Sequence, residues 1–255
     1  NGKKAMAIFD SLIIKYPDIP FLYERTGNMK AFSNEFDKSI EYWKKALEIN
    51  PKSYYSALRL GLLHVNVGTE FAPLPLERRN LDEGKKWLNE ASKIRPNASA
   101  TPRFLGNFYR AELDLDKALE VYELAVKKNT EKTSQLMEQN LMVGHTLMAM
   151  GKYDDARDAY KKTIDVSINN FWWGQNHIYS SYTYLAEKKY DQAIRFLSQA
   201  QESLKKMDDS AEIIDFIVNR IEFNKWLVIS HSQRKEEAMI SMKKMNDKRY
   251  SDLQT

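Results

Sequence analysis

The chain has 255 residues, of which 43% are hydrophobic and 29% charged, a composition typical of a folded protein and not of a disordered one. Its net charge of +4 comes from 39 basic and 35 acidic residues mixed along the chain, which is weak support for nucleic-acid binding. There is no cysteine, which excludes disulfides, thiol catalysis and zinc–thiolate sites but fits both the cytoplasm and the periplasm. There is also no run of about 18 apolar residues, so we expect no membrane span in this chain.

Apolar residues recur at helical spacing along nearly the whole chain, and alternating strand-like stretches are lacking. Proline, glycine and asparagine interrupt this pattern at intervals and separate the expected helices. We therefore predict helix pairs along one array that covers residues 1–255. In chain order, it has a half repeat at 1–18, repeats at about 20–51, 54–96 with an insertion at 69–80, 99–130, 134–168, 174–206 and 211–247, and a C-terminal tail at 248–255.

A small residue marks the second helix of each unit, and a large residue follows it four positions later. The small residues are Ala5, Ser39, Gly84, Ala118, Ala156, Ala193 and Ala238. The large ones are Phe9, Trp43, Leu88, Tyr122, Tyr160, Leu197 and Met242. The small residues are 34, 45, 34, 38, 37 and 45 residues apart, a basal period with insertions that is typical of a repeat array.

Acidic residues precede these small residues by two positions in six units, namely Asp37, Asp82, Asp116, Asp154, Asp191 and Glu236. At a helix start, such a side chain can accept hydrogen bonds from free backbone N–H groups. Glycines mark the first helices, at Gly27, Gly61, Gly106 and Gly144. Glycine inside a helix costs about 1 kcal/mol relative to alanine, so its recurrence predicts a close helix crossing, with the small residue of the second helix facing the glycine.

These marks resemble the tetratricopeptide repeat (TPR), a 34-residue helix–turn–helix. The second unit has Tyr23, Gly27, Ser39, Trp43, Ala46 and Pro51; the third has Leu60, Gly61, Gly84, Leu88, Ala91 and Pro96; and the fifth has Gly144, Gly151, Tyr153, Ala156 and Tyr160. The resemblance implies an all-α fold, a right-handed α-solenoid of stacked antiparallel helix pairs. Ser181 and Trp226 replace the glycine in the last two units.

Two features depart from a plain array. The insertion at 69–80 contains Pro73 and Pro75, which forbid one continuous helix there. We interpret it as a tolerated surface insertion, with a contact loop that uses Phe71, Leu74 and Leu76 as the alternative. The chain also begins inside a second helix, which is typical of a fragment or processed product of a longer protein.

No motif for catalysis is present. The four histidines fall in different units without the spacing of metal ligands, and the phosphate-binding loops and the GxSxG motif are missing. We therefore expect no enzyme, no cofactor and no metal site. Asp154-Asp155 and Asp208-Asp209 are interpreted as helix-start or solvated residues, not as catalytic pairs.

Stacked TPR pairs line a concave surface with their first helices. The resemblance implies a peptide-binding groove lined by Phe21, Glu24, Asn28, Tyr55, Leu58, Leu62, Arg103, Asn107, Arg110, Leu141, His145, Met148, Ile178 and Tyr182. Such a lining can bind a peptide backbone, a carboxylate or apolar side chains. The alternative for each residue is a solvated helix face without a ligand.

The leading hypothesis is a non-enzymatic scaffold that binds a peptide or protein segment in this groove. An alternative is a regulatory or sensor TPR segment of a longer enzyme or signalling protein. Self-association through Met239, Met242 and Met245 is a further possibility. RNA binding is not favoured, because a phosphate-binding stripe of lysine and arginine is not evident. The clamp with which some TPR proteins bind chaperone C-termini is incomplete, since Glu24 stands where its first lysine would be.

Overall fold

The computed structural model describes residues 2–65, 74, 78–129, 134–232, 234, 237, 239, 240 and 243. Within these residues the secondary structure is helical, and no strand is present. The helices are α1 (Gly2–Lys15), α2 (Pro20–Phe32), α3 (Phe36–Ile49), α4 (Tyr54–Val65), α5 (Leu81–Ile94), α6 (Ala100–Ala111), α7 (Leu115–Lys128), α8 (Ser134–Ala149), α9 (Tyr153–Asp165), α10 (Asn170–Ala186), α11 (Tyr190–Leu204) and α12 (Ala211–His231). The predicted all-α class is confirmed. None of these helices is both long and apolar enough to cross a membrane.

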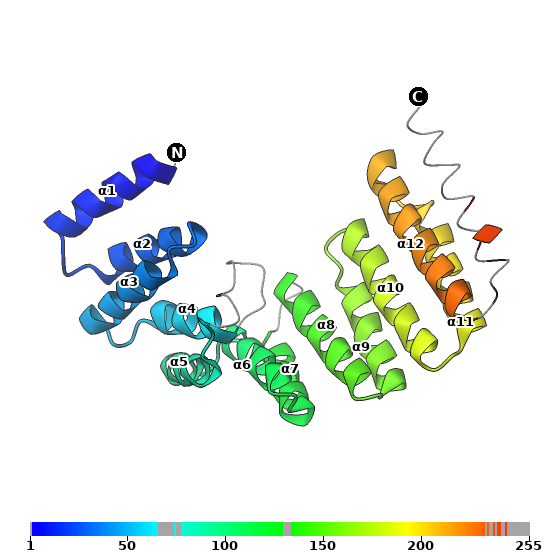
Figure 1. The fold of residues 1–255 in the computed structure, drawn as a ribbon, viewed down its shortest axis with the longest axis horizontal. Helices are drawn as coiled ribbons and strands as arrows, with labels where there is room; N and C mark the ends of the chain where they lie inside the picture. Colours follow the sequence, from blue (N-terminus) through cyan, green and yellow to red (C-terminus); the bar gives the residue numbers. More distant parts are fainter. Residues whose placement is uncertain are drawn as a thin grey trace. The chain divides into compact units, whose positions relative to one another are not determined.

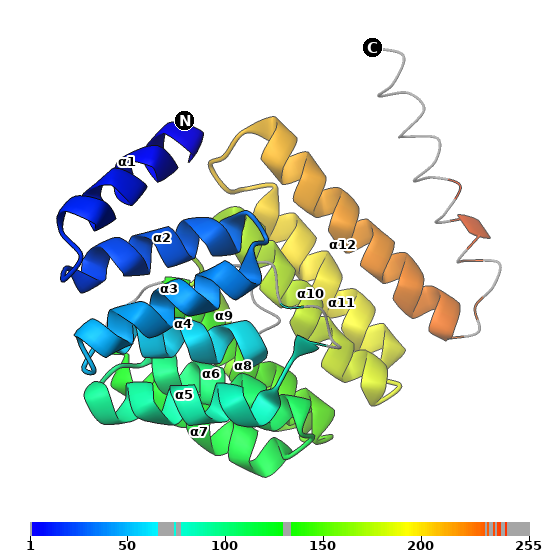
Figure 2. The ribbon, with the colours of Figure 1, turned by 60° about the vertical axis from the view of Figure 1, so that its left-hand side comes forward.

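The chain forms two compact units, residues 1–129 and 130–255, which we call unit 1 and unit 2. Neighbouring helices pair as predicted, α2 with α3, α4 with α5 and α6 with α7 in unit 1, and α8 with α9 and α10 with α11 in unit 2 (Figure 1). Helix α1 packs against α2, and α12 packs against α10 and α11 (Figure 2). The boundary between the units coincides with a predicted repeat boundary; a single continuous array stays a prediction.

The predicted close crossing is present in the pair α2–α3. The hydroxyl of Ser39, fully buried, donates a hydrogen bond of 2.8 Å to the carbonyl oxygen of Gly27. A Cβ on Gly27 would lie 2.7 Å from the Trp43 ring, which is closer than real side chains approach. The small residue therefore faces the glycine, as predicted, and the bulky residue one turn later covers it.

Four turns between paired helices share a backbone feature. Asn34, Leu113, Gly151 and Lys188 have φ angles of 60°, 59°, 74° and 60°. In each turn, the N–H after this residue donates to a carbonyl five positions earlier, a hydrogen bond that ends a helix in the Schellman motif. Glycine suits the left-handed region best, so the other three residues adopt it at a cost.

The helix starts differ from the prediction. Asp37, Asp82, Asp116, Asp154 and Asp191 lie one position inside their helices. The side chains that do accept from the backbone belong to the preceding cap residues, where Asn80 accepts from Glu83 N at 2.9 Å and Asp114 from Lys117 N at 3.3 Å. The aspartates still suit the positive end of the helix dipole. Glu236 lies outside the described residues.

In the described part of the insertion between α4 and α5, one side chain lies in the core. Leu74 is 1% exposed and packs in a cluster with Ala31, Phe36 and Trp43. The Arg79 side chain donates to the Leu74 carbonyl at 2.8 Å and holds this residue in place. Leu74 is therefore a packing residue and not an exposed contact residue; Phe71 and Leu76 lie outside the described residues.

Candidate functional site

The first helices of unit 1 are joined by polar side chains at the predicted groove positions. Asn28 on α2 donates through Nδ2 to the hydroxyl of Tyr55 on α4. Ser53, just before α4, donates to Glu24 Oε1 at 2.6 Å. These bonds fix the side chains of successive first helices relative to one another, so this surface is pre-ordered.

An aromatic–arginine pair recurs on the same surface. The Arg25 guanidinium lies 4.9 Å from the centre of the Phe21 ring, and Arg59 lies 4.8 Å from that of Tyr55. In each pair the arginine follows the ring by one helical turn, and the two pairs are 34 residues apart. Phe21 is 50% exposed. Both rings are among the predicted groove residues and neither arginine is, although the repeated four-residue spacing was a signal for them.

The predicted groove residues on α6 differ in how far their side chains are exposed. Arg103 is 8% exposed, and its guanidinium lies over the Phe104 ring at 4.2 Å. Asn107 is half-buried and accepts a hydrogen bond of 2.5 Å from the Tyr122 hydroxyl through Oδ1. Arg110 is exposed. Of this set, Arg110 offers the most surface to a partner.

Several predicted groove residues lie in the cores of their units. Leu58 and Leu62 are 9% and 3% exposed and pack in one cluster with Phe104. Ile178 in unit 2 is 1% exposed and packs against Leu197. These side chains stabilise the fold where they are, and their predicted contact with a partner stays a prediction.

In unit 2, the predicted groove residues are held by internal contacts. His145 Nδ1 lies 2.8 Å from the Tyr160 hydroxyl, and the imidazole packs edge-on against Tyr179. The Tyr182 hydroxyl donates to Asn224 Oδ1 at 2.6 Å, and burial raises the pKa of Tyr182. Leu141 is buried and Met148 half-buried. Met239 is 70% exposed, while Met242 and Met245 lie outside the described residues.

Comparison with known proteins identifies the repeat. The family model described as "Tetratricopeptide repeat" matches residues 140–167, which include α9. Anaphase-promoting complex subunit 3 of Schizosaccharomyces pombe is 28% identical over 118 residues, which is 46% of this chain and 16% of that relative. The chain therefore contains a tetratricopeptide repeat at residues 140–167. The match covers about a sixth of the relative's length, so the relative's activity as a whole does not transfer to this TPR chain.

Solved TPR structures agree with this fold. A crystal structure of MamA matches with a TM-score of 0.59 and 19% identity, over 74% of this chain and 94% of that one. YrrB, described as a TPR protein with an unusual peptide-binding site, matches with a TM-score of 0.55 and 17% identity, over 76% of this chain and 91% of that one. At this level of identity the likeness concerns the fold of the TPR chain alone.

Proposed function

We propose that this TPR protein is a non-enzymatic scaffold that binds an extended peptide or protein segment on the first-helix surface of unit 1. The observation that supports the proposal is the recurrence of the aromatic–arginine pair, at Phe21 and Arg25 and again at Tyr55 and Arg59. Beside these pairs lies Asn28, whose side chain is hydrogen-bonded to the Tyr55 hydroxyl. The peptide-binding site of YrrB and the membership of the matched relative in a complex are compatible with it.

The chemistry of this surface suits a peptide. A half-exposed ring such as Phe21 offers apolar area to a side chain at little conformational cost. The adjacent Arg25 is exposed and has no carboxylate partner among the described residues, so it can bind a carbonyl or carboxylate of the segment. Because Glu24 and Asn28 are already ordered by their hydrogen bonds, little further ordering is needed on binding.

The test uses peptides selected by display on the purified chain, and a variant in which Phe21→Ser is combined with Arg25→Gln. We expect the variant to bind the selected peptides at least about tenfold more weakly, since buried aromatic and arginine contacts dominate such interfaces. Arg103 and Asn107 are poorer choices for substitution, because the first is buried and the second accepts from Tyr122.

A matched control combines Leu124→Ser with Lys127→Gln on α7. Both residues are exposed on a second helix of the same unit, so the control removes the same kinds of group from another surface. Circular dichroism and thermal unfolding check that both variants fold. Equal binding by the Phe21/Arg25 variant and the wild type would show that the first-helix surface of unit 1 is not the binding site.

A further inference from the structure

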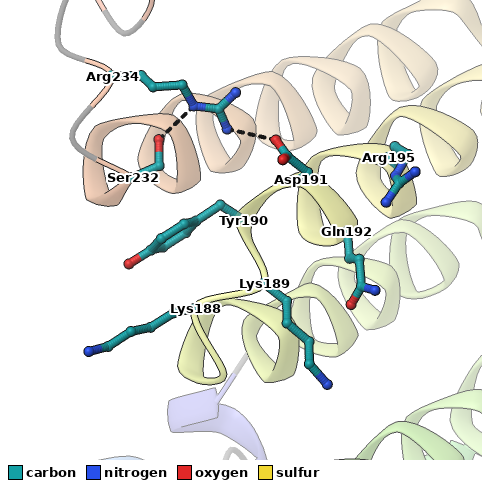
Figure 3. Close-up of a pocket in the computed structure, with 8 residues that line it drawn as sticks. All are labelled: Lys188, Lys189, Tyr190, Asp191, Gln192, Arg195, Ser232 and Arg234. Atoms are coloured by element: carbon teal, nitrogen blue, oxygen red, sulfur yellow. Dashed lines mark hydrogen bonds and ion pairs between the residues drawn. The ribbon is translucent and has the colours of Figure 1, made fainter.

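An open cavity of about 500 Å³ lies in unit 2, where the turn between α10 and α11 meets residues that follow α12. Among its described lining residues are four cationic side chains, those of Lys188, Lys189, Arg195 and Arg234, and one carboxylate, that of Asp191. Figure 3 shows the cationic side chains arranged around the start of α11. The cavity uses none of the predicted groove residues.

Two of the four cations are already neutralised. Arg234 donates through Nη2 to Asp191 at 3.1 Å, and its Nη1 lies 3.5 Å from Glu237. Lys189 pairs with Glu187 at 2.7 Å. These contacts account for the acidic groups that the structure places beside the cavity.

The Asp191–Arg234 pair has a structural counterpart elsewhere. In unit 1, Arg78 pairs with Asp37, which occupies the same position in α3 as Asp191 does in α11. The recurrence shows that this ion pair is a contact between successive repeats. It is therefore part of the cavity wall and not a free binding group.

The other two cations, Lys188 and Arg195, are exposed and form no ion pair within the described part of the chain. The repeat itself does not require a positive charge at the position of Arg195. The corresponding residues of α3, α7 and α9 are acidic, namely Glu41, Glu120 and Asp158, whereas α5 has Lys86. The repeat pattern therefore accepts either charge at this position.

We propose that this cavity is a second interaction site, which docks an acidic peptide segment through carboxylates that pair with Lys188 and Arg195. Complementary charge steers such a segment and sets its register. Lys188 lies in the turn before α11, and Arg195 lies seven positions later, on the helix itself. In Figure 3 their side chains lie on different sides of the start of α11.

Two cations at different places on the cavity wall, one in the turn and one on the helix, favour a segment with several carboxylates over a single phosphate group. Side chains on one face of an extended peptide recur about every 7 Å, so acidic residues at alternate positions present their carboxylates in a row.

The experiment measures binding of a fluorescein-labelled hexaglutamate peptide to the whole chain by fluorescence anisotropy at low salt. The test variant combines Lys188→Gln with Arg195→Gln. Because each exposed ion pair contributes modestly to affinity, we expect the loss of two such pairs to raise Kd about fivefold. Amide signals of Tyr190 and Gln192 in NMR spectra of the wild type should shift on titration with the peptide, since these residues line the cavity.

A control variant, Lys161→Gln with Lys162→Gln, changes the net charge equally at two exposed residues of α9 outside the cavity. An equal loss of affinity in both variants would show that the change in net charge alone weakens binding, and it would overturn the proposal. Unchanged binding by the Lys188/Arg195 variant would overturn it as well. The proposal would also be overturned if a single-phosphoserine peptide, or a short single-stranded RNA of equal charge, bound at this cavity more tightly than the hexaglutamate peptide.

Discussion

Gly144 and Tyr160 meet so closely that a Cβ on the glycine would lie 2.6 Å from Cε1 of the tyrosine ring. The hydroxyl of the same tyrosine lies 2.8 Å from Nδ1 of His145. In unit 1, the Tyr122 ring covers Gly106, and its hydroxyl donates to Asn107. One tyrosine therefore both closes the helix crossing and fixes the residue after the glycine, which is a predicted groove position in each unit.

We predict that Gly144→Ala lowers the free energy of unfolding, although alanine is the better helix former. Overpacking a tight contact costs about 1–3 kcal/mol, which outweighs the gain of about 1 kcal/mol in helix propensity. Urea unfolding followed by circular dichroism measures the difference. Combining the change with Tyr160→Leu, which removes the obstructing ring, should make the added methyl group less costly. A Gly144→Ala variant more stable than the wild type would contradict the close packing.

The turn residue Leu113 gives a prediction in the opposite direction. Its φ is 59° and its side chain is 82% exposed, so Leu113→Gly removes backbone strain and loses little packing. Because the left-handed conformation costs a non-glycine residue about 1–2 kcal/mol, we expect a net gain of about 0.5–1 kcal/mol in stability.

The reciprocal change, Gly151→Ala, should reduce stability by about 1 kcal/mol. Gly151 has a φ of 74°, and no atom lies near the place of a Cβ, so strain and not a clash is tested there. Thermal unfolding of both variants provides the measurement. Effects of the same sign at the two positions would contradict the role assigned to the turn.

His177 should make the protein less stable in mild acid. Burial lowers its pKa, against a smaller opposing effect of the hydrogen bond with the Trp173 carbonyl. The ring also stacks against Trp173 and Phe196. Because the folded-state pKa lies below the unfolded value of about 6.5, the unfolded state binds the proton more readily, and stability is lost as the pH falls through this range.

The variant His177→Gln should therefore have a lower free energy of unfolding than the wild type at about pH 7.5, because it loses the packing of the neutral ring. This difference in the free energy of unfolding, which we call the gap, should become smaller toward about pH 5.5. The other three histidines are the same in both proteins, so their contribution cancels in the comparison. Chemical unfolding at several pH values measures the gap. A gap that stays constant would show that His177 has the same pKa in both states.

Glu187 is expected to act at lower pH. Hydrogen bonds from Lys189 and, to a smaller extent, from Arg157 lower its pKa, while burial opposes them. The Arg157–Glu187 pair has a separation of 2.5 Å, and both side chains are less than one-fifth exposed. The stabilisation is complete above the unfolded-state pKa of about 4.3 and is lost as the pH falls through the folded-state pKa.

Glu187→Gln should thus lower the free energy of unfolding by about 1 kcal/mol at neutral pH, and the difference should vanish toward about pH 3. Asp154→Asn is the control, since Asp154 also pairs with Arg157 but its side chain is 90% exposed. Its substitution should cost clearly less. Equal costs for the two variants would mean that burial does not strengthen the Glu187 pair.

The correct part of the fold prediction depended on residues that are close in sequence. Gly27, Ser39 and Trp43 lie within one repeat, so their spacing alone indicated that two paired helices cross closely. The left-handed turns at Leu113 and Lys188 could not be predicted in this way, because neither residue prefers that conformation. In these turns, the packing of the second helix against the first outweighs the backbone preference of the turn residue.

The candidate site depends on the exposure of individual side chains, which the repeat pattern does not give. Phe21 and Tyr55 are predicted groove residues, and the structure adds the arginines beside them. Leu58 and Leu62 were assigned to the same surface, yet they are in the core. The exposure of a helix face depends on the rotation of neighbouring helices, and a repeat pattern does not encode that rotation at each position.

The sequence by itself determined that this protein is built of paired helices, because each unit carries its own small residue, bulky residue and helix ends. Only the tertiary structure decided which groups of successive repeats contact one another. Asp191 and Arg234 are 43 residues apart, and their ion pair, with the basic cavity beside it, exists because helix packing brings those turns together. Contacts of this kind depend on long-range packing geometry, which short-range spacing cannot specify.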